Sequence, residues 1–263
     1  MGLAPTDRWL EQDEGDPLRV CARLAPFFAD APARAIHRYL CLYGMYRSAR
    51  QAVRLLPEMK AKGLWERLAR LYDEQRVRWK GPDVPVFLLP ADDENRKLLR
   101  EFRGKGGVAF ADKLVFFLLP DHRDEEVAAL VAHEYNHVCR LKQLPYGGKE
   151  ATLLDAVIME GLAEHAVAET VGPEQCADWT SYYTDREIER FWRRYIAPNQ
   201  DAAVSHPLSS RILYGLGWYP NMGGYAVGYA IVRRCLEREY SLAQLMAMEA
   251  KQMVALAGLD SRG

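Results

Sequence analysis

Hydrophobic and polar positions along the chain predict a mainly helical protein. Apolar residues recur three and four positions apart over residues 33–56 and again over residues 64–79, which is the spacing of amphipathic helices. Pro57 should end the first of these helices, and the Gly81-Pro82 pair should end the second. The stretch before residue 33 reads as a polar segment. The pattern therefore predicts an N-terminal helical subdomain over residues 1–81.

The pattern changes character after residue 82. Short runs rich in Val, Leu and Phe predict strands at residues 84–89, 108–110 and 114–119. Glycines at residues 104–107 predict a turn or a flexible rim. Helical spacing predicts the other elements, over residues 94–102, 121–143, 152–170, 184–195 and 223–240 and from residue 241 onward. We therefore expect an α+β, mainly α fold, with a small sheet before a long helix. Residues 82–263 form the second domain, and the whole chain is one compact unit.

The helix expected at residues 121–143 contains the motif His133-Glu134-Tyr135-Asn136-His137. Residues four apart on an α-helix differ by about 40° around its axis, so the two histidines project from one face and can share a metal ion. Glu134 lies about 100° from His133, where it can reach a water at the metal without binding the metal itself. Apolar neighbours bury this helix, so unsatisfied imidazoles would be costly. The H-E-x-x-H spacing predicts a zinc-hydrolase site.

A catalytic zinc ion takes three protein ligands, so a third ligand is expected elsewhere in the chain. Glu160 and Glu164 lie one turn apart and share a face of the helix expected at residues 152–170. Antiparallel pairing of this helix with the motif helix, through the loop at residues 145–148, can bring Glu160 to the histidines. Gly161 has no side chain to keep the two helices apart.

His165 is the alternative third ligand on the same helix. It lies about 140° from Glu160 around the helix axis, so the two side chains cannot face the same metal ion. Either residue type binds zinc. Spacing alone leaves both alternatives open.

Three segments together resemble known families. HEYNH at residues 133–137, followed by EGLAE at 160–164, is similar to the gluzincin pattern, in which the Glu of an E-G-x-A segment is the third zinc ligand. Together with MEGLAEH and with GGYAVGYAIV at 223–232, they resemble more closely a bacterial family of predicted zinc-dependent proteases of unknown function. This resemblance runs from about residue 82 to residue 235. It implies a zincin-like fold, zinc as the cofactor and a peptide or protein substrate.

The resemblance also implies roles for individual residues. His133, His137 and Glu160 would bind zinc, and Glu134 would be the general base. Glu164, one turn after the ligand Glu, would brace a ligand histidine and fix its orientation. In zincins the small sheet leads into the active-site helix, and its edge strand typically pairs with an extended peptide substrate.

Hydrolysis of an amide also needs a donor for the developing oxyanion. In several gluzincins a Tyr or His from outside the zinc-binding helices supplies it. The candidates here are Tyr225, Tyr229 and His206, and we favour Tyr225. Tyr225 and Tyr229 are four residues apart and share a helix face. Each of the three residues also has a simpler interpretation, as a packing or hydrogen-bonding residue of the core.

Composition and charge exclude several classes of protein. The formal net charge of −1 gives no electrostatic footprint for nucleic acid or for an anionic membrane. No signal-peptide pattern and no apolar run of membrane-spanning length is present. The cysteines are odd in number and widely spaced, which argues against a disulfide framework; they are Cys21, Cys41, Cys139, Cys176 and Cys235. We therefore expect a reduced, cytoplasmic protein that binds neither nucleic acid nor membrane.

The favoured hypothesis is a zinc metallopeptidase in which Glu134 takes a proton from the attacking water. The alternative is a zinc-stabilised binding or regulatory protein that keeps a gluzincin fold without turnover. A third interpretation, a helical interaction protein without metal, requires the H-E-x-x-H motif to be accidental. Zinc in the purified protein would exclude the third interpretation, and an open coordination position would favour the first.

Overall fold

The computed structural model describes residues 2–145 and 150–259, and its internal contacts divide the chain into two compact units. The first comprises residues 1–138 and the second residues 139–263. This division falls within the helix at residues 124–143. The domain boundary near residue 81, which the change in sequence pattern suggests, stays a prediction. Residues 146–149, most of the loop expected between the two zinc-binding helices, lie outside the described residues.

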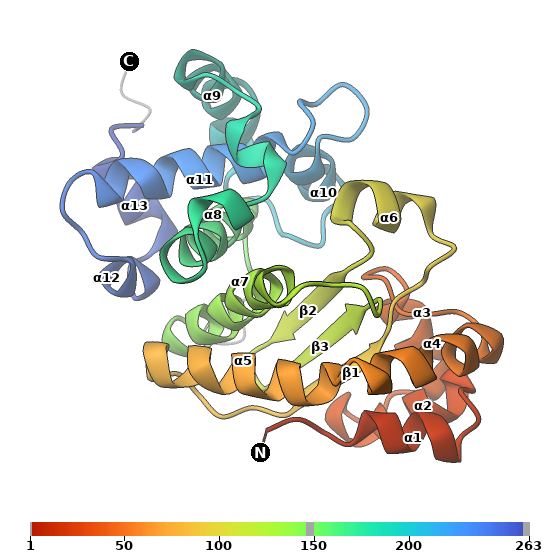
Figure 1. The fold of residues 1–263 in the computed structure, drawn as a ribbon. Helices are drawn as coiled ribbons and strands as arrows, with labels where there is room; N and C mark the ends of the chain where they lie inside the picture. Colours follow the sequence, from red (N-terminus) through yellow and green to blue (C-terminus); the bar gives the residue numbers. More distant parts are fainter. Residues whose placement is uncertain (1, 146–149, 260–263) are drawn as a thin grey trace. The chain divides into compact units, whose positions relative to one another are not determined.

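The first unit contains helices that surround its sheet (Figure 1). They are α1 Thr6–Gln12, α2 Pro17–Leu24, α3 Ala33–Leu40, α4 Ala49–Ala61, α5 Leu64–Trp79 and α6 Arg96–Phe102, with a 3-10 turn at Ala25–Phe27. The predicted helix at residues 64–79 is confirmed. The segment before residue 33, which reads from the sequence as polar and to which no helix was assigned, forms α1 and α2. Helix α1 buries Thr6 and Leu10, whereas the buried residues of α2 recur at helical spacing, at Pro17, Val20, Cys21 and Leu24.

The single helix predicted over residues 33–56 is in fact two helices. Gly44 has φ +113, a conformation that ends the helical path after α3. Ser48 then starts α4 with a capping box, in which its hydroxyl accepts from the Gln51 N–H and the Gln51 side chain accepts from the Ser48 N–H. Pro57 lies inside α4 without ending it. Pro57 and Val53 are both exposed, so water can satisfy the Val53 carbonyl that loses its helical partner.

The sheet of the first unit has three strands in the order β1-β3-β2. Strand β1 (Val86–Pro90) runs parallel to β3 (Lys113–Leu118), and β2 (Gly106–Phe110) runs antiparallel to β3. Every residue of β1 and β3 is buried, whereas most of β2 is half-buried. Strands β1 and β2 are therefore the outer strands of this sheet, and β2 is the less buried of the two.

The glycines at residues 106 and 107 are wrongly predicted as part of a turn, because they are the first residues of β2. A side chain at either position would collide with a neighbouring segment. A Cβ on Gly106 would lie 2.2 Å from the Tyr43 carbonyl oxygen, and a Cβ on Gly107 would lie 2.6 Å from Cγ of Glu134. These glycines are thus required by close approach to other parts of the unit.

Helix α7 (Asp124–Gln143) follows the sheet; it confirms the predicted helix and its end near residue 143, and it begins three residues later than the predicted start at residue 121. Acidic residues fill its first turn, where the helix dipole favours them. The Tyr135 hydroxyl donates to the Pro82 carbonyl oxygen over 2.9 Å, and its ring packs edge-on against Tyr72 of α5. These contacts fix the rotation of α7 about its own axis, and with it the direction of each side chain of the H-E-x-x-H motif.

The second unit is helical in its described part (Figure 1). Its longer helices are α8 Leu153–Thr170, α9 Asp185–Phe191, α10 Pro207–Tyr214, α11 Gly223–Leu236, α12 Leu242–Met246 and α13 Ala250–Leu256. A π-helical turn at Trp192–Ile196 continues α9, and 3-10 turns lie at Pro173–Gln175, Asp178–Ser181 and Ala197–Asn199. The helix predicted to reach residue 240 ends at Leu236, and two short helices replace the last predicted one. The two units together confirm an α+β, mainly α fold.

Helices α8 and α11 pack against each other at two glycines. A Cβ on Gly161 would lie 2.3 Å from the carbonyl carbon and oxygen of Gly228, and a Cβ on Gly228 would lie 1.9 Å from the Val157 carbonyl oxygen. The two backbones are therefore in direct contact at this crossing. From the sequence, Gly161 was expected to let α8 approach the motif helix; in the structure its open side faces α11.

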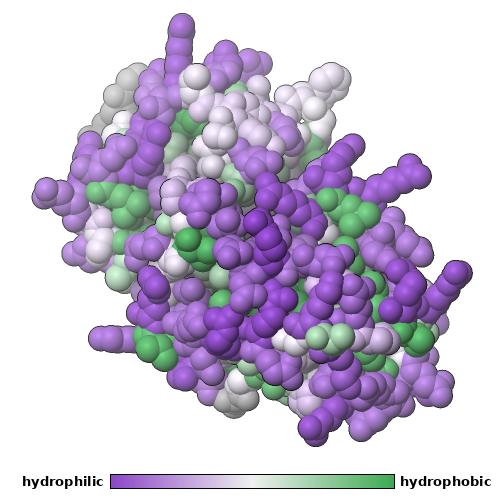
Figure 2. Space-filling model, in the orientation of Figure 1, coloured by the Kyte–Doolittle hydropathy of each residue, from purple (hydrophilic) through white to green (hydrophobic). Residues whose placement is uncertain are grey.

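The surface shown in Figure 2 is mostly hydrophilic, and hydrophobic side chains appear on it as small separate areas. The most exposed large apolar side chain is Trp218, at 88%, in the loop after α10. Among the described residues, no helix combines the length and the apolar character needed to cross a membrane.

Candidate metal centre

His133 and His137 form a pair on one face of α7. Their ring centroids are 4.7 Å apart and the ring planes are inclined at 83°. His137 is buried, at 8% exposure, and His133 is half-buried. This is the arrangement that the four-residue spacing predicts, with both imidazoles projecting from the same face.

Glu134 is also buried, at 8% exposure, and lies against the backbone of β2. A Cβ on Gly107 would come within 2.8 Å of Cδ and Oε1 of its carboxyl group. The absence of a side chain at Gly107 therefore makes the space that this carboxyl group occupies. The edge strand and the Glu of the motif are in contact, which places the carboxyl group beside the strand that could hold a peptide.

The last turn of α7 belongs to the second unit and is anchored there. Arg140 is buried, and its Nη1 donates to the carbonyl oxygens of Leu245 and Met246 over 3.0 and 2.8 Å. These carbonyls lie at the end of α12, where helical carbonyls lack intrahelical partners.

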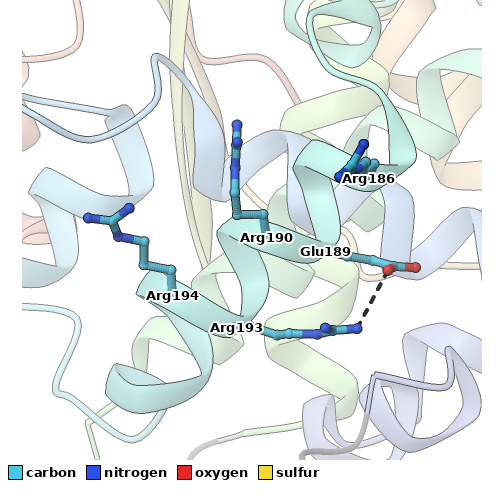
Figure 3. A pocket seen from close by; sticks show the side chains of 5 residues that line it. All are labelled: Arg186, Glu189, Arg190, Arg193 and Arg194. Atoms are coloured by element: carbon cyan, nitrogen blue, oxygen red, sulfur yellow. Dashed lines mark ion pairs between the residues drawn. The ribbon is translucent and has the colours of Figure 1, made fainter.

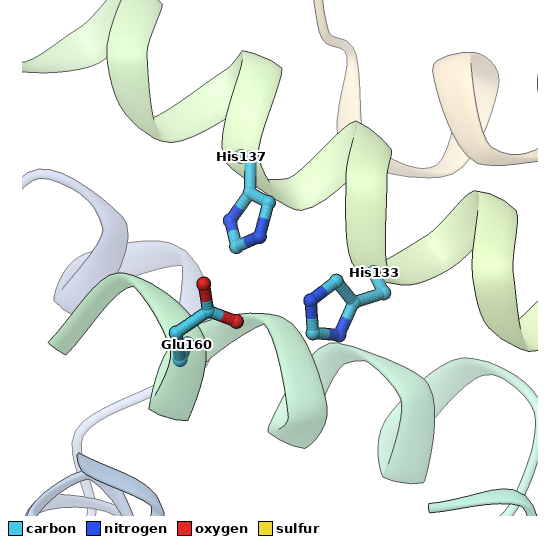
Figure 4. A group of neighbouring side chains, drawn as sticks. All are labelled: His133, His137 and Glu160. Atoms are coloured by element: carbon cyan, nitrogen blue, oxygen red, sulfur yellow. The ribbon is translucent and has the colours of Figure 1, made fainter. Parts of the chain in front are cut away.

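Glu160 lies in the first half of α8, whose start is fixed by a capping box between Thr152 and Asp155. Figure 4 shows Glu160 on α8 and the two histidines on α7. One potential ligand atom from each of His133, His137 and Glu160 lies within 4.8 Å of the other two. Two imidazole nitrogens and a carboxylate oxygen are a donor set that suits Zn²⁺. Of the two alternatives for the third residue, the structure brings Glu160, and not His165, to the histidine pair.

Tyr225 of α11 forms a hydrogen bond with Glu160 and another with Tyr214. Its ring also packs edge-on against Trp179, with centroids 5.3 Å apart. Burial, together with the nearby Glu160 carboxylate, holds the pKa of Tyr225 well above its ordinary value of 10.0. The phenol therefore stays protonated and can donate to the carboxylate. Tyr225 was expected from the sequence as an oxyanion donor, and the structure gives its hydroxyl a partner on the proposed ligand.

His165 and Tyr229 form a second pair on the same two helices. Their rings are stacked, with centroids 4.0 Å apart and planes inclined at 4°. Nε2 of His165 lies 3.0 Å from the backbone carbonyl oxygen of Tyr229, so this nitrogen carries a proton and donates to the carbonyl. Burial is the largest cause that lowers the pKa of His165, from 6.5 to about 4. This histidine is a neutral residue of the helix interface.

The stability of the protein should fall in acid because of His165. In the unfolded chain His165 binds a proton with a pKa near 6.5, whereas in the folded chain its pKa is about 4. The stability that neutral His165 allows is therefore fully present above pH 6.5 and is lost as the pH falls toward 4. The loss from pH 7 to pH 4.5 should be about 2 kcal/mol. Urea unfolding in the presence of chelator measures it, and His165→Gln should show a smaller loss. Equal pH dependence in both proteins would contradict the prediction.

Two further residues have structural partners that bear on their expected roles. The Glu164 carboxylate accepts from the Ala177 N–H, so at least one of its oxygens holds the segment after α8. Whether it also braces a ligand histidine stays a prediction. His206 is exposed and caps α10, with its Nδ1 accepting from the Leu208 N–H over 3.1 Å.

Three residues of this region were not singled out from the sequence. Tyr214 forms a hydrogen bond with Tyr225. Gly228 makes the contact with α8, and Gly107 leaves the space that Glu134 occupies. Gly228 has a readable signal, because it lies between Tyr225 and Tyr229 in a helix that tolerates glycine only at a cost. Tyr214 has none, since it lies in an ordinary amphipathic helix.

Comparison with known proteins gives a consistent relationship. The model of a family of unknown function, described as "Predicted Zn-dependent protease", matches residues 64–255. The uncharacterized protein YjaZ of Bacillus subtilis (strain 168) is 37% identical over 239 residues, which cover 90% of this chain and 91% of that protein. The uncharacterized protein YjfC of the same organism is 22% identical over 230 residues, covering 81% and 76%. The chain therefore belongs to this family of predicted Zn-dependent proteases.

Proposed function

We propose that this protein is a zinc-dependent peptidase that holds its metal ion with His133, His137 and Glu160. The observation that carries the proposal is the grouping of these three ligand atoms within 4.8 Å of one another, on two helices that lie within the residues matched by the family model. Two histidines and one glutamate are the ligand set of several zinc peptidases, and three protein ligands leave a coordination position for water. Zinc bound there would lower the pKa of that water and polarise the peptide carbonyl.

Glu134 is the proposed general base. It lies about 100° from His133 around α7, so its carboxylate does not point along the same direction as the ligand imidazoles. Its burial against β2 keeps bulk water away from the carboxylate and places it next to the proposed substrate strand. The carboxylate would take a proton from the attacking water and then deliver it to the leaving amine.

Tyr225 is proposed to orient the Glu160 carboxylate. A hydrogen bond from a buried phenol leaves the carboxylate fewer orientations, and partners of this kind raise metal affinity about 10–100-fold. Of the three residues proposed from the sequence to stabilise an oxyanion, Tyr229 is stacked on His165 and His206 caps a helix. Because a phenol has one O–H proton and that of Tyr225 is used on Glu160, we propose Tyr225 as an orienting residue, and the oxyanion donor stays a prediction.

The substrate is proposed to be an extended peptide that pairs with β2. This strand pairs with β3 on one side and is an outer strand of the sheet as described. Pairing by backbone hydrogen bonds would give affinity without demanding particular side chains.

Zinc analysis of a ligand variant tests the proposal. Wild-type protein purified without added metal should contain about one zinc ion per chain. Glu160→Gln should bind zinc at least about a hundredfold more weakly, since even outer partners of ligands contribute about 10–100-fold. Glu169→Gln is the matched control, because Glu169 lies on the same helix but is exposed, and it should bind zinc normally. Mass spectrometry measures the zinc content of each protein, and competition with a chelator measures its zinc affinity.

The outcomes separate the candidate functions. No zinc in the wild-type protein would contradict the metal site itself. Zinc that Glu160→Gln does not weaken would leave the histidine pair but exclude Glu160 as a ligand. Stoichiometric zinc without cleavage of a mixed quenched-peptide library would instead favour a zinc-stabilised binding or regulatory protein.

A further inference from the structure

A cluster of arginines lies on α9 and on the π-helical turn that continues it. Arg186, Arg190, Arg193 and Arg194 are all exposed, and together with Glu189 they line an open pocket of about 450 Å³. Figure 3 shows Arg193 reaching toward Glu189, whereas Arg190 and Arg194 project away from that pair. Four guanidinium groups within nine residues stand out in a chain whose formal net charge is −1.

Only part of this charge is neutralised within the protein. Arg193 lies 3.7 Å from the Glu189 carboxylate, and Arg234 of α11 lies 3.1 Å from the same carboxylate. In the parts of the chain that the structure describes, Arg186, Arg190 and Arg194 have no carboxylate within ion-pair distance. Arginines that are exposed and lack acidic partners can bind carboxylates of another molecule with two parallel hydrogen bonds.

Aromatic rings extend this charged area. The Arg194 guanidinium lies 5.4 Å from the centre of the Tyr195 ring, and the Tyr195 and Tyr219 rings are 5.2 Å apart. The Arg211 guanidinium in turn lies 5.7 Å from the Tyr219 ring. Stacking on a ring holds a guanidinium in place and lowers the entropy lost when it binds an anion. We call the set Arg186, Arg190, Arg194, Tyr195, Tyr219 and Arg211 the Arg/Tyr surface.

The spacing of the arginines matches an extended polypeptide. Arg186, Arg190 and Arg194 follow one another at four-residue intervals, which is about 6 Å along an α-helix. Alternate side chains of an extended peptide recur on one face about every 6.6 Å. The helix includes a π-helical turn at Trp192–Ile196, a feature that is frequent at functional sites.

We propose that the Arg/Tyr surface binds an acidic segment of another polypeptide in an extended conformation, with carboxylates at alternate positions on successive arginines. A nucleic-acid partner fits less well, because nucleic-acid binding normally accompanies a strongly basic domain and the net charge here is −1. The surface lies in the second unit and includes no proposed zinc ligand. The proposal therefore goes beyond the peptidase activity and stands or fails independently of it.

Fluorescence anisotropy with a labelled peptide of about ten residues that alternates Glu and Ser tests the proposal. The Glu134→Gln protein serves as the background so that the peptide is not consumed. Binding is expected, should weaken as salt is raised, and should be lost with a peptide in which Gln replaces each Glu. Adding Arg190→Gln and Arg194→Gln together should weaken binding about tenfold.

Arg193→Gln is the matched control, since Arg193 is an exposed arginine of the same helix that is already paired with Glu189. It should weaken binding less than about twofold. Equal binding of the Glu and Gln peptides would overturn the proposal, and so would equal losses in the Arg190, Arg194 and Arg193 single variants. Tighter binding of a single-stranded oligonucleotide of the same charge would overturn the assignment to an acidic polypeptide.

Discussion

Replacing Glu134 with Gln is expected to abolish peptide hydrolysis while zinc stays bound. The amide has the same shape as the carboxylate but cannot accept the proton of the attacking water, and general acid–base catalysis contributes about 10²–10⁴-fold. Zinc content should not change, because His133, His137 and Glu160 are the proposed ligands. The measurements are kcat/KM with a quenched peptide and metal content on the same samples.

A second variant separates the position of Glu134 from its chemistry. Gly107→Ala places a methyl group 2.6 Å from Cγ of Glu134, so the carboxyl group must move although it remains ionisable. Activity should fall by about tenfold or more, since small misplacements of a catalytic group are costly. Full activity in the Glu134→Gln variant would contradict the proposed role of Glu134 as the general base. Loss of zinc in that variant would instead show that Glu134 supports the metal site.

The histidine pair could be predicted because its relationship is local. His133 and His137 lie one turn apart on one helix, and helical geometry alone fixes their common face. The limits of α5 and the end of α7 were also readable, since long amphipathic segments with clear end signals carry their own information. The short helix α1 was missed because its two buried residues, Thr6 and Leu10, give no measurable period. Helix α2 was missed although its buried residues recur at helical spacing, at Pro17, Val20, Cys21 and Leu24.

The contacts of glycines could not be predicted, because a glycine's role depends on what packs against it. From the sequence, the missing side chain of Gly161 could allow close approach of the motif helix or equally of another helix. The structure shows that the other helix is α11 and that the touching residue is Gly228. In the same way, Gly107 reads as a turn residue until the position of Glu134 is known. Pairing across the fold is set by tertiary packing and leaves no periodic signal in one sequence.

The glycine crossing is where the second unit should be most sensitive to substitution. In Gly228→Ala the new methyl group would lie 1.9 Å from the Val157 carbonyl oxygen and 2.8 Å from its carbonyl carbon. Both atoms belong to the backbone of α8 and cannot rotate away, so the two helices must separate. Overpacking of this kind typically costs 1–3 kcal/mol, and contact with backbone puts the expected loss at about 3 kcal/mol. The urea midpoint of unfolding measures it.

The same substitution should weaken zinc binding, although residue 228 is not a ligand. Tyr225 lies one turn before Gly228 on α11, and separation of the helices would draw its hydroxyl away from Glu160. Gly223→Ala is the control on the same helix: the atoms nearest to its methyl group belong to the Pro220 side chain, at 3.1 Å, and not to the backbone of α8, so the loss of stability should be much smaller. A destabilised Gly228→Ala protein with wild-type zinc affinity would show that the crossing serves folding alone. Loss of both stability and zinc affinity in Gly228→Ala would show that the contact between Gly161 and Gly228 holds Tyr225 against the Glu160 carboxylate.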